Sequence, residues 1–130
     1  MKVPPQLPFE CAALLGCAVI TGAGAVLNGS GVAPGNTVAV IGCGGIGLNA
    51  VQAARLAGAQ RVFGIDIDPA ELELAKRSGA TDVIHAEEND ATGLIHEATG
   101  GGVDFAFECV GREATVRDAV AMLRPGAPRM

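Results

Sequence analysis

The sequence predicts an α/β fold built on a doubly wound parallel sheet, and three observations carry that prediction. Four short apolar runs, each typical of a buried strand, alternate with longer stretches of helical pattern. The first of these runs opens directly into a glycine-rich turn. Hydrophobic residues make up 49% of the chain but aromatic residues only 3%, which suits aliphatic strands covered by alanine-rich helices. With 130 residues, the chain forms at most one domain.

The elements follow one another in a regular order. Three prolines mark residues 1–8 as a linker that enters from something upstream, and one domain is expected over residues 9–130. Two helical stretches, 9–15 and 17–27, are separated by Gly16. Strands are then expected at 38–41, 61–65, 82–85 and 103–108, and helices at 46–56, 69–77, 91–98 and 112–123.

Charge and cysteine content exclude several classes of protein. The net charge of −5 argues against a nucleic-acid surface. Glycines break the most hydrophobic window, 11–27, so we expect neither a membrane span nor a signal peptide. The four cysteines form no regular framework, which favours reduced thiols and a cytoplasmic location.

The turn after the first strand carries the spacing G-x-G-x-x-G at Gly42, Gly44 and Gly47. In this motif the first glycine permits the sharp turn out of the strand. The second lets a pyrophosphate approach the backbone, and the third lets the next helix pack closely on the sheet. The positive end of that helix then faces the phosphates. A fortuitous glycine turn is the alternative, because the chain contains 19 glycines.

An acidic residue ends the second strand, as dinucleotide binding requires. Asp66 lies 24 residues after Gly42 and is placed to accept hydrogen bonds from a ribose 2′-OH. The bland alternative is a helix cap, but Asp68, directly before Pro69, fits that role better. The sequence therefore predicts a Rossmann fold that prefers NAD to NADP, since no Lys or Arg follows closely to receive a 2′-phosphate.

A wider pattern then supports a family resemblance. The chain combines Gly16-Cys17 and Thr21-Gly22 with the glycine turn, Gly64-Ile65-Asp66, Gly79-Ala80-Thr81, Gly102-Val103-Asp104-Phe105 and Phe107-Glu108-Cys109-Val110-Gly111. Over about residues 7–126 it resembles the coenzyme domain of zinc-dependent alcohol dehydrogenases, in the medium-chain dehydrogenase/reductase superfamily. Within that superfamily it is nearest to the glutathione-dependent formaldehyde dehydrogenase branch.

The resemblance implies a set of site residues and partners. Cys17 matches one ligand of the family's catalytic zinc, and Thr21 matches a residue that packs against the nicotinamide. Zinc is implied for the full-length enzyme only, together with an alcohol or aldehyde substrate and a homo-oligomeric state. The implied NAD contacts are Thr21, Gly42, Gly44, Gly45, Ile46, Gly47, Asp66, Ile67, Cys109, Val110 and Arg112.

The chain also departs from the family pattern. The resemblance implies that residues 1–8 are a linker from a missing upstream catalytic domain and that residues 9–130 are the dinucleotide-binding Rossmann domain, incomplete at the C-terminus. The other two zinc ligands, the structural zinc lobe and the proton-relay residues are missing, so we expect this fragment to be inactive by itself. Glu71 stands where the family often has a basic residue. After Gly126 the chain reads Ala-Pro-Arg-Met and does not continue into a fifth strand, so the fold looks truncated before the fifth and sixth strands.

This ending leaves an edge. The expected fourth strand would carry Val103, Phe105 and Phe107 on one face, with no proline or lysine guarding its outer side. The tail 127–130 is too short to cover that edge, so we expect self-association or marginal stability of a monomer.

The remaining candidates have bland interpretations. Cys11 is expected to be a packing residue, Cys43 a variable loop position, and His85 and His96 solvated surface residues. Two other functions stay open: a zinc-independent medium-chain reductase and a non-enzymatic dinucleotide-binding module. A methyltransferase is a more distant alternative.

Overall fold

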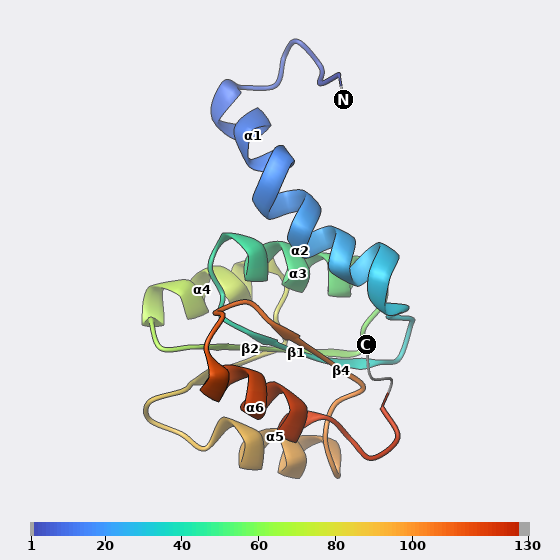
Figure 1. The fold of residues 1–130 in the computed structure, drawn as a ribbon, viewed down its shortest axis with the longest axis vertical. Helices are drawn as coiled ribbons and strands as arrows, with labels where there is room; N and C mark the ends of the chain where they lie inside the picture. Colours follow the sequence, from blue (N-terminus) through green and yellow to red (C-terminus); the bar gives the residue numbers. More distant parts are fainter. Residues whose placement is uncertain (1, 128–130) are drawn as a thin grey trace.

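The computed structural model describes residues 2–127 and contains one four-stranded parallel sheet with the order β3-β2-β1-β4 (Figure 1). Its strands are β1 (Thr37–Ile41), β2 (Arg61–Asp66), β3 (Asp82–His85) and β4 (Phe105–Glu108). Neighbouring strands pair in parallel throughout. The predicted α/β class with a doubly wound parallel sheet is confirmed, and the first three strands lie within one residue of their predicted bounds.

Helices cover both faces of this sheet, as a doubly wound fold requires (Figure 1). On one face lie α3 (Gly45–Leu56) and α4 (Pro69–Ser78). On the other lie α5 (Ala91–Thr99) and α6 (Glu113–Met122). The predicted end signals hold, since Asp68 accepts a hydrogen bond from Ala70 N–H at the start of α4. Gly79 ends α4 in the left-handed conformation.

Strand β1 is the centre of the core, and its side chains alternate between two clusters. Val38 and Val40 pack with α3 residues such as Val51, whereas Ala39 and Ile41 pack with Ile95 of α5 and Met122 of α6. Residues 38–41 are all buried. A strand with both faces covered reads as a continuous apolar run, which is why β1 was predictable from sequence.

The N-terminal segment corrects the prediction of two helices. Helical structure runs without a break through α1 (Phe9–Leu14), a π-helical segment (Leu15–Val19), α2 (Ile20–Gly24) and a second π-helical segment (Ala25–Ser30). Gly16 does not interrupt it, since a glycine in a helix interior costs only ~1 kcal/mol. The helix ends at Gly31, whose φ of 77° is left-handed.

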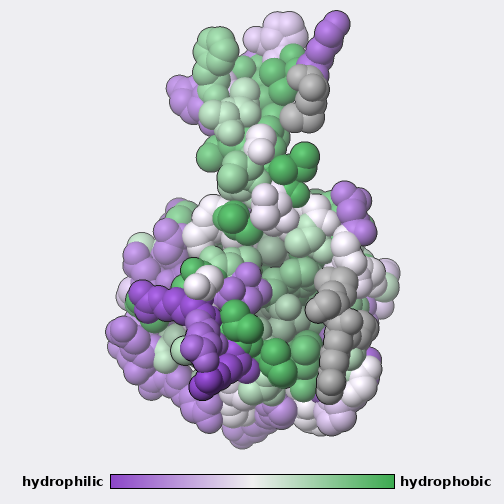
Figure 2. Space-filling model, in the orientation of Figure 1, coloured by the Kyte–Doolittle hydropathy of each residue, from purple (hydrophilic) through white to green (hydrophobic). Residues whose placement is uncertain are grey.

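The same long helix meets the length and composition of a membrane span, although its glycines had suggested a broken window. Phe9–Ser30 is 22 residues long and, by length and composition alone, apolar enough to cross a membrane. Its first part projects from the domain with hydrophobic side chains on view (Figure 2), and Phe9 is 92% exposed. Its second part packs on α3, where Gly22 and Val26 are buried. The glycines that appeared to break the window leave the helix continuous.

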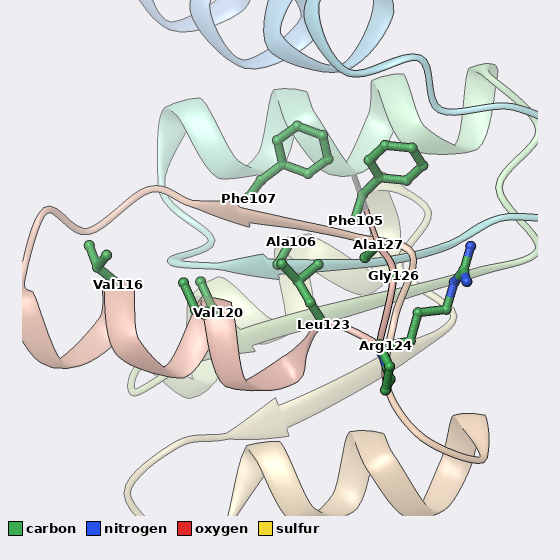
Figure 3. A pocket seen from close by; sticks show the side chains of 11 residues that line it. Phe105, Ala106, Phe107, Val116, Val120, Leu123, Arg124, Gly126 and Ala127 are labelled. Carbon is green, nitrogen blue, oxygen red and sulfur yellow. The ribbon is translucent and has the colours of Figure 1, made fainter. Parts of the chain in front are cut away.

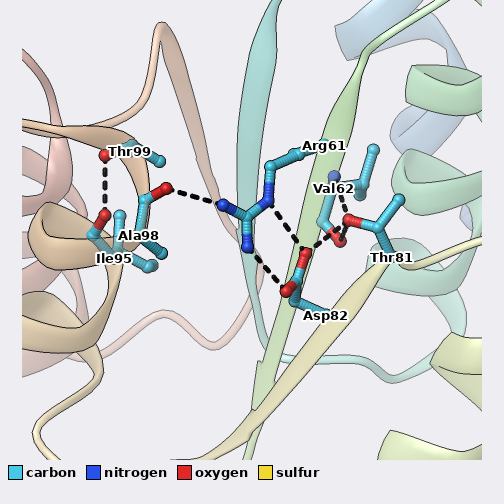
Figure 4. Close-up of polar contacts among 7 residues, drawn as sticks. All are labelled: Arg61, Val62, Thr81, Asp82, Ile95, Ala98 and Thr99. Atoms are coloured by element: carbon cyan, nitrogen blue, oxygen red, sulfur yellow. Dashed lines mark hydrogen bonds and ion pairs between the residues drawn. The ribbon is translucent and has the colours of Figure 1, made fainter.

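The side chain of Arg61 connects the sheet to helix α5 through hydrogen bonds. Arg61 of β2 donates to both carboxylate oxygens of Asp82 on β3, at 3.2 and 2.7 Å, and to the carbonyl of Ala98 in α5 at 2.6 Å (Figure 4). Thr81 adds a hydrogen bond of 2.6 Å to the same aspartate. The guanidinium beside Asp82 lowers the pKa of that carboxyl. This cluster lies at the opposite ends of the strands from the glycine turn, so its role is structural.

A second structural carboxylate interrupts the alternation that was expected in the fourth strand. Asp104 accepts hydrogen bonds from the backbone and the hydroxyl of Thr37 at 2.7 and 3.0 Å, and it also binds Arg124. Strand β4 is regular only from Phe105 onward. Val103 packs in the cluster of Ala39, whereas Phe105 packs in the cluster of Val38. The prediction that Val103 and Phe105 share one face is therefore wrong.

The chain covers its own strand edge only just before β4, at Val103, so the expectation of an unguarded edge is wrong at that residue. Leu123 pairs in parallel with Val103, where Arg124 N–H donates to Val103 O at 2.9 Å. Beyond this point a groove of about 590 Å³ follows the edge (Figure 3). The groove is lined by Phe105, Ala106, Phe107, Val116, Ala119, Val120, Leu123, Arg124, Pro125, Gly126 and Ala127. The predicted tail beyond Ala127 lies outside the described residues.

Candidate coenzyme crevice

The glycine turn has the geometry that each motif position requires. Gly42 has φ = 88°, a conformation that side-chain-bearing residues rarely adopt. A Cβ at Gly47 would lie 1.8 Å from the carbonyl oxygen of Gly42, so this close contact between turn and helix excludes any side chain. A Cβ at Gly44 would meet nothing within 4 Å. The turn is therefore closely packed against the helix at Gly47 but open at Gly44, which leaves room for a ligand beside the backbone of Gly44.

The N-terminus of α3 faces this open space. Gly44 is the N-cap of the helix, and Leu48 N–H is the donor that bonds back to Gly44 O. The N–H groups of Gly45, Ile46 and Gly47 therefore belong to the first turn, where no intrahelical acceptor is available. Such a turn attracts anions because its free donors and the helix dipole point the same way.

The long N-terminal helix crosses this end of α3. A Cβ at Gly45 would lie 3.5 Å from the Cβ of Ala18, and one at Gly22 would lie 2.2 Å from Ile46 O. The contact brings the helical turns that carry Cys17 and Thr21 beside the glycine turn. Both residues are exposed. Gly22, within the predicted Thr-Gly pair, is required because only a residue without a side chain allows this approach.

Asp66 links the end of β2 to the glycine turn. Its Oδ2 accepts a hydrogen bond from Cys43 N–H at 2.6 Å, and its Oδ1 accepts from Ile67 and Asp68 N–H at 2.7 and 2.9 Å. An ionised carboxylate has about four acceptor positions, so a further donor such as a ribose hydroxyl can still be bound. The N-cap of α4 is Asp68 and not Asp66, so the alternative that Asp66 is merely a helix cap is excluded.

The loop after β4 closes the other side of the glycine turn. Glu108 Oε1 accepts hydrogen bonds from Val110 N–H and Gly111 N–H at 2.8 and 2.9 Å, and from the Thr115 hydroxyl at 2.8 Å. Partial burial opposes ionisation of Glu108, but these bonds outweigh it and lower the pKa of the carboxyl. A Cβ at Gly42 would lie 2.7 Å from Val110 Cγ2. The two loops are therefore in contact.

The four cysteines have different surroundings. Cys43 is fully buried, and burial together with the Asp66 carboxylate raises the pKa of its thiol to about 12. Burial and the Glu108 carboxylate raise the pKa of the Cys109 thiol to about 11. Both thiols are thus protonated at neutral pH. Cys11 is exposed, which corrects the expectation that it packs in the interior. Within residues 2–127, no three His, Cys, Asp or Glu side chains gather closely enough to hold a metal ion.

The two histidines are not simply solvated, as the sequence had suggested. His96 Nε2 lies 2.7 Å from the carbonyl oxygen of Ala121, so it joins α5 to α6. His85 is half-buried, and its Nδ1 is buried without a hydrogen-bond partner among the described residues. The contact of His96 could not be read from a single sequence, because it depends on how α5 packs on α6.

Sequence reasoning also missed how the site is held together. The bond from Cys43 N–H to Asp66 and the four donor contacts to Glu108 were not predicted. A signal was present for Glu108, because a carboxylate two to three residues before a glycine often accepts the backbone N–H groups of a turn. No local signal marks the contact of Asp66 with Cys43, which joins positions 23 residues apart.

Comparison with known proteins places the chain in a family. Residues 45–128 match the family model described as zinc-binding dehydrogenase. The chain is 48% identical over 127 residues to an S-(hydroxymethyl)glutathione dehydrogenase of Synechocystis sp., which covers 96% of this chain and 34% of that protein. Among solved structures, benzyl alcohol dehydrogenase from Acinetobacter calcoaceticus is 38% identical with a TM-score of 0.91, covering 100% of this chain and 38% of that one. An alcohol dehydrogenase zinc-binding domain protein from Burkholderia ambifaria is 44% identical with a TM-score of 0.90, covering 95% and 33%.

The glycine turn, the acidic strand end and these matches together define a coenzyme-binding Rossmann domain. The chain belongs to the zinc-binding dehydrogenase family, and the resemblance to zinc-dependent alcohol dehydrogenases is confirmed. It spans about a third of the length of the curated relatives it matches. The solved benzyl alcohol dehydrogenase covers the whole chain, including the long N-terminal helix.

Proposed function

We propose that this chain binds NAD in the crevice between the glycine turn and the loop after β4. It would act as the coenzyme-binding part of an alcohol dehydrogenase that transfers hydride from an alcohol to the nicotinamide. The single observation that carries the proposal is the glycine turn, open above Gly44 and closed beneath Gly47, with Asp66 bonded to it. The pyrophosphate would lie on the N–H groups of Gly45, Ile46 and Gly47.

The two ends of the coenzyme would bind on opposite sides of that turn. Asp66 and Ile67 lie on the β2 side and would hold the adenosine ribose. Cys109, Val110 and Arg112 lie on the β4 side, towards which the nicotinamide half would extend, with Thr21 of the long helix nearby. Cys109 would contribute its backbone, since its protonated thiol is a weak donor.

Zinc does not fit the residues of this chain alone. Cys17 is exposed and offers one thiolate, and the described residues contain no metal-holding cluster around it. Catalytic zinc normally takes three protein ligands, so Cys17 would be one ligand of a site completed by other residues. In a full-length protein zinc would supply Lewis-acid polarisation of the alcohol oxygen. We therefore expect residues 1–130 alone to bind coenzyme without oxidising alcohols.

Two other functions remain in competition. A zinc-independent reductase of the same superfamily would need no Cys17 thiolate, and replacing Cys17 in a full-length relative would decide that question. A non-enzymatic dinucleotide-binding module would bind NAD as well, and only the activity of a chain with a catalytic domain distinguishes it. The proposal also includes a homo-oligomeric, cytoplasmic protein and a linker role for residues 1–8.

The test is calorimetric titration of the purified chain with NAD⁺, NADP⁺ and Zn²⁺. We expect weak but measurable NAD⁺ binding, weaker NADP⁺ binding and no stoichiometric Zn²⁺ binding. Failure of NAD⁺ to bind at millimolar concentration, by a chain that melts cooperatively, would contradict the proposal.

A further inference from the structure

His85 ends β3 directly beside Asp66, the carboxylate that we propose binds the ribose. The two residues are register partners in the parallel pairing of β2 with β3, and neighbouring strands lie about 4.8 Å apart. Ile65 and Ile84, the pair before them, both pack in the core on the side of α5 and α6. Because side chains alternate along a strand, Asp66 and His85 share the opposite face of the sheet, on which α4 packs.

Hydrogen bonding within the domain does not account for the imidazole of His85. Its Nδ1 is buried without a partner among the described residues, although the residue as a whole is only half-buried. The backbone at this position is held without the ring, since His85 O accepts hydrogen bonds from Asn89 Nδ2 at 3.0 Å and Glu88 N–H at 3.3 Å. A buried polar atom without a partner costs free energy. The ring is therefore not explained by the stability of the fold.

His85 can supply positive charge at an end of the sheet that otherwise carries negative charge. The charged side chains on the surrounding elements are Asp66 of β2, Asp68 and Glu71 at the start of α4, and Glu87 and Glu88 after β3. Farther along α4, Glu73 pairs with Lys76. Lys76 and Arg77 belong to the last turn of α4, which leads back to the opposite edge of the sheet. Histidine is the side chain whose charge ordinarily changes between about pH 5 and 8.

We propose that His85 is a specificity-determining residue for the 2′ position of the adenosine ribose, and that its protonation weakens the preference for NAD over NADP that Asp66 provides. The inference rests on the proposed function. Beside a neutral ring, the Asp66 carboxylate accepts the 2′-OH of NAD⁺ and repels the 2′-phosphate of NADP⁺. A protonated ring on the next strand offsets that repulsion and attracts the phosphate. Acid should therefore strengthen the binding of NADP⁺ relative to that of NAD⁺.

The experiment measures the Kd of NAD⁺ and of NADP⁺ by calorimetric titration of the full chain at about pH 8 and about pH 6, which span the protonation of an ordinary histidine. The 2′-phosphate itself gains a proton at about pH 6, and His85→Gln retains that effect while it removes the histidine. On acidification, we expect the ratio of the Kd for NADP⁺ to the Kd for NAD⁺ to fall about fivefold more in the unmutated chain than in His85→Gln, as for a partly exposed charge pair. His96→Gln is the matched control, because it removes the other histidine, which contacts Ala121 of α6. It should keep the pH dependence of the unmutated chain.

A second measurement follows the His85 ring itself. In NMR titrations of the unmutated chain, saturating NADP⁺ should move the protonation midpoint of His85 to higher pH, because two binding events that favour each other do so reciprocally. NAD⁺, which has no 2′-phosphate, should produce no such shift. The midpoint of His96 should stay the same with either coenzyme. A purely structural role of His85 would not produce this difference between the coenzymes.

The outcomes separate the two proposals. If the unmutated chain binds NAD⁺ and the ratio of dissociation constants changes equally in His85→Gln, the role of His85 is refuted while the proposed function stands. A ratio that does not fall on acidification of the unmutated chain would refute that role as well. If the unmutated chain binds neither coenzyme, the proposed function itself fails. Should His85→Gln not fold, His85→Asn is a second variant without a titrating ring. The NMR titration decides without any variant, since a His85 midpoint that NADP⁺ leaves unmoved contradicts the inference.

Discussion

Replacing Asp66 should separate ribose recognition from support of the glycine turn. Asp66→Ser removes the negative charge, the acceptor of Cys43 N–H and the expected acceptor of the ribose 2′-OH. A hydrogen bond to a charged group is worth about 1.5–3 kcal/mol, and every 1.4 kcal/mol changes a dissociation constant about tenfold. Loss of the ribose contact alone should therefore weaken NAD⁺ binding by about 10- to 100-fold.

The two roles of Asp66 affect the two cofactors differently. Weaker support of the glycine turn acts on NAD⁺ and NADP⁺ alike, since both place a pyrophosphate there. Loss of the carboxylate removes a contact only from NAD⁺, and it relieves the repulsion of the 2′-phosphate only for NADP⁺. The ratio of the two dissociation constants therefore reports ribose recognition, and the loss common to both reports the bond from Asp66 to Cys43.

Calorimetric titration of both cofactors into both chains measures these quantities. Asp68→Asn is the matched control, because it removes a charge two residues away while asparagine caps a helix as well as aspartate does. We expect the control to keep the preference for NAD⁺. Equal affinity of the unmutated chain for NAD⁺ and NADP⁺, or an unchanged ratio in Asp66→Ser, would refute the assignment of Asp66 to the ribose.

Four further predictions test other parts of the structure. Gly47→Ala should lower the melting temperature and abolish NAD⁺ binding, since its Cβ would lie 1.8 Å from Gly42 O; a variant that binds normally would disprove the tight contact. Although burial opposes ionisation of Asp104, its bonds to Thr37 and Arg124 depress the pKa of the carboxyl below the ordinary 3.8. Its contribution to the free energy of unfolding should therefore be complete above that pH and be lost as the pH falls through the lowered pKa. Denaturant melts of the unmutated chain and Asp104→Asn should thus converge in acid, and a constant difference would argue against this linkage. Residues 1–130 alone should neither retain zinc through mild chelation nor form NADH from a primary alcohol, because Cys17 is a single ligand. The chain should also self-associate through the edge of β4, and light scattering from a monodisperse monomer at high concentration would count against that.

Much of the fold was predictable because its signals are local. The run 38–41 is apolar on both faces, and such a run between turn residues is typical of a central parallel strand. Asp68 before Pro69 marked the start of α4, which ends at Gly79 in the structure. The glycine spacing predicted the turn because Gly42 has a left-handed φ and Gly47 makes a contact that no side chain allows.

The N-terminal helix shows where local signals mislead. Gly16, Gly22 and Gly24 suggested interruptions, yet the helix is continuous from Phe9 to Ser30. Gly22 serves a contact instead, because it lets Ile46 of α3 approach the helix backbone. A glycine that breaks a helix and a glycine that lets two helices touch look the same in one sequence, since the difference lies in the partner element.

The strand ends at the crevice give the same lesson for the site. Asp66 and Glu108 each end a strand of the same parallel sheet, so both residues lie at the same edge of that sheet. From the sequence, Asp66 was assigned to the ribose because it ends the second strand after a glycine turn, and Glu108 was assigned nothing. In the structure the two carboxylates act alike, since each accepts hydrogen bonds from three donors in the segments that border Gly42. A ligand-binding carboxylate and a loop-ordering carboxylate are therefore not separate categories here. In the proposed complex, Asp66 would bind the ribose and would also hold the turn on which the pyrophosphate rests.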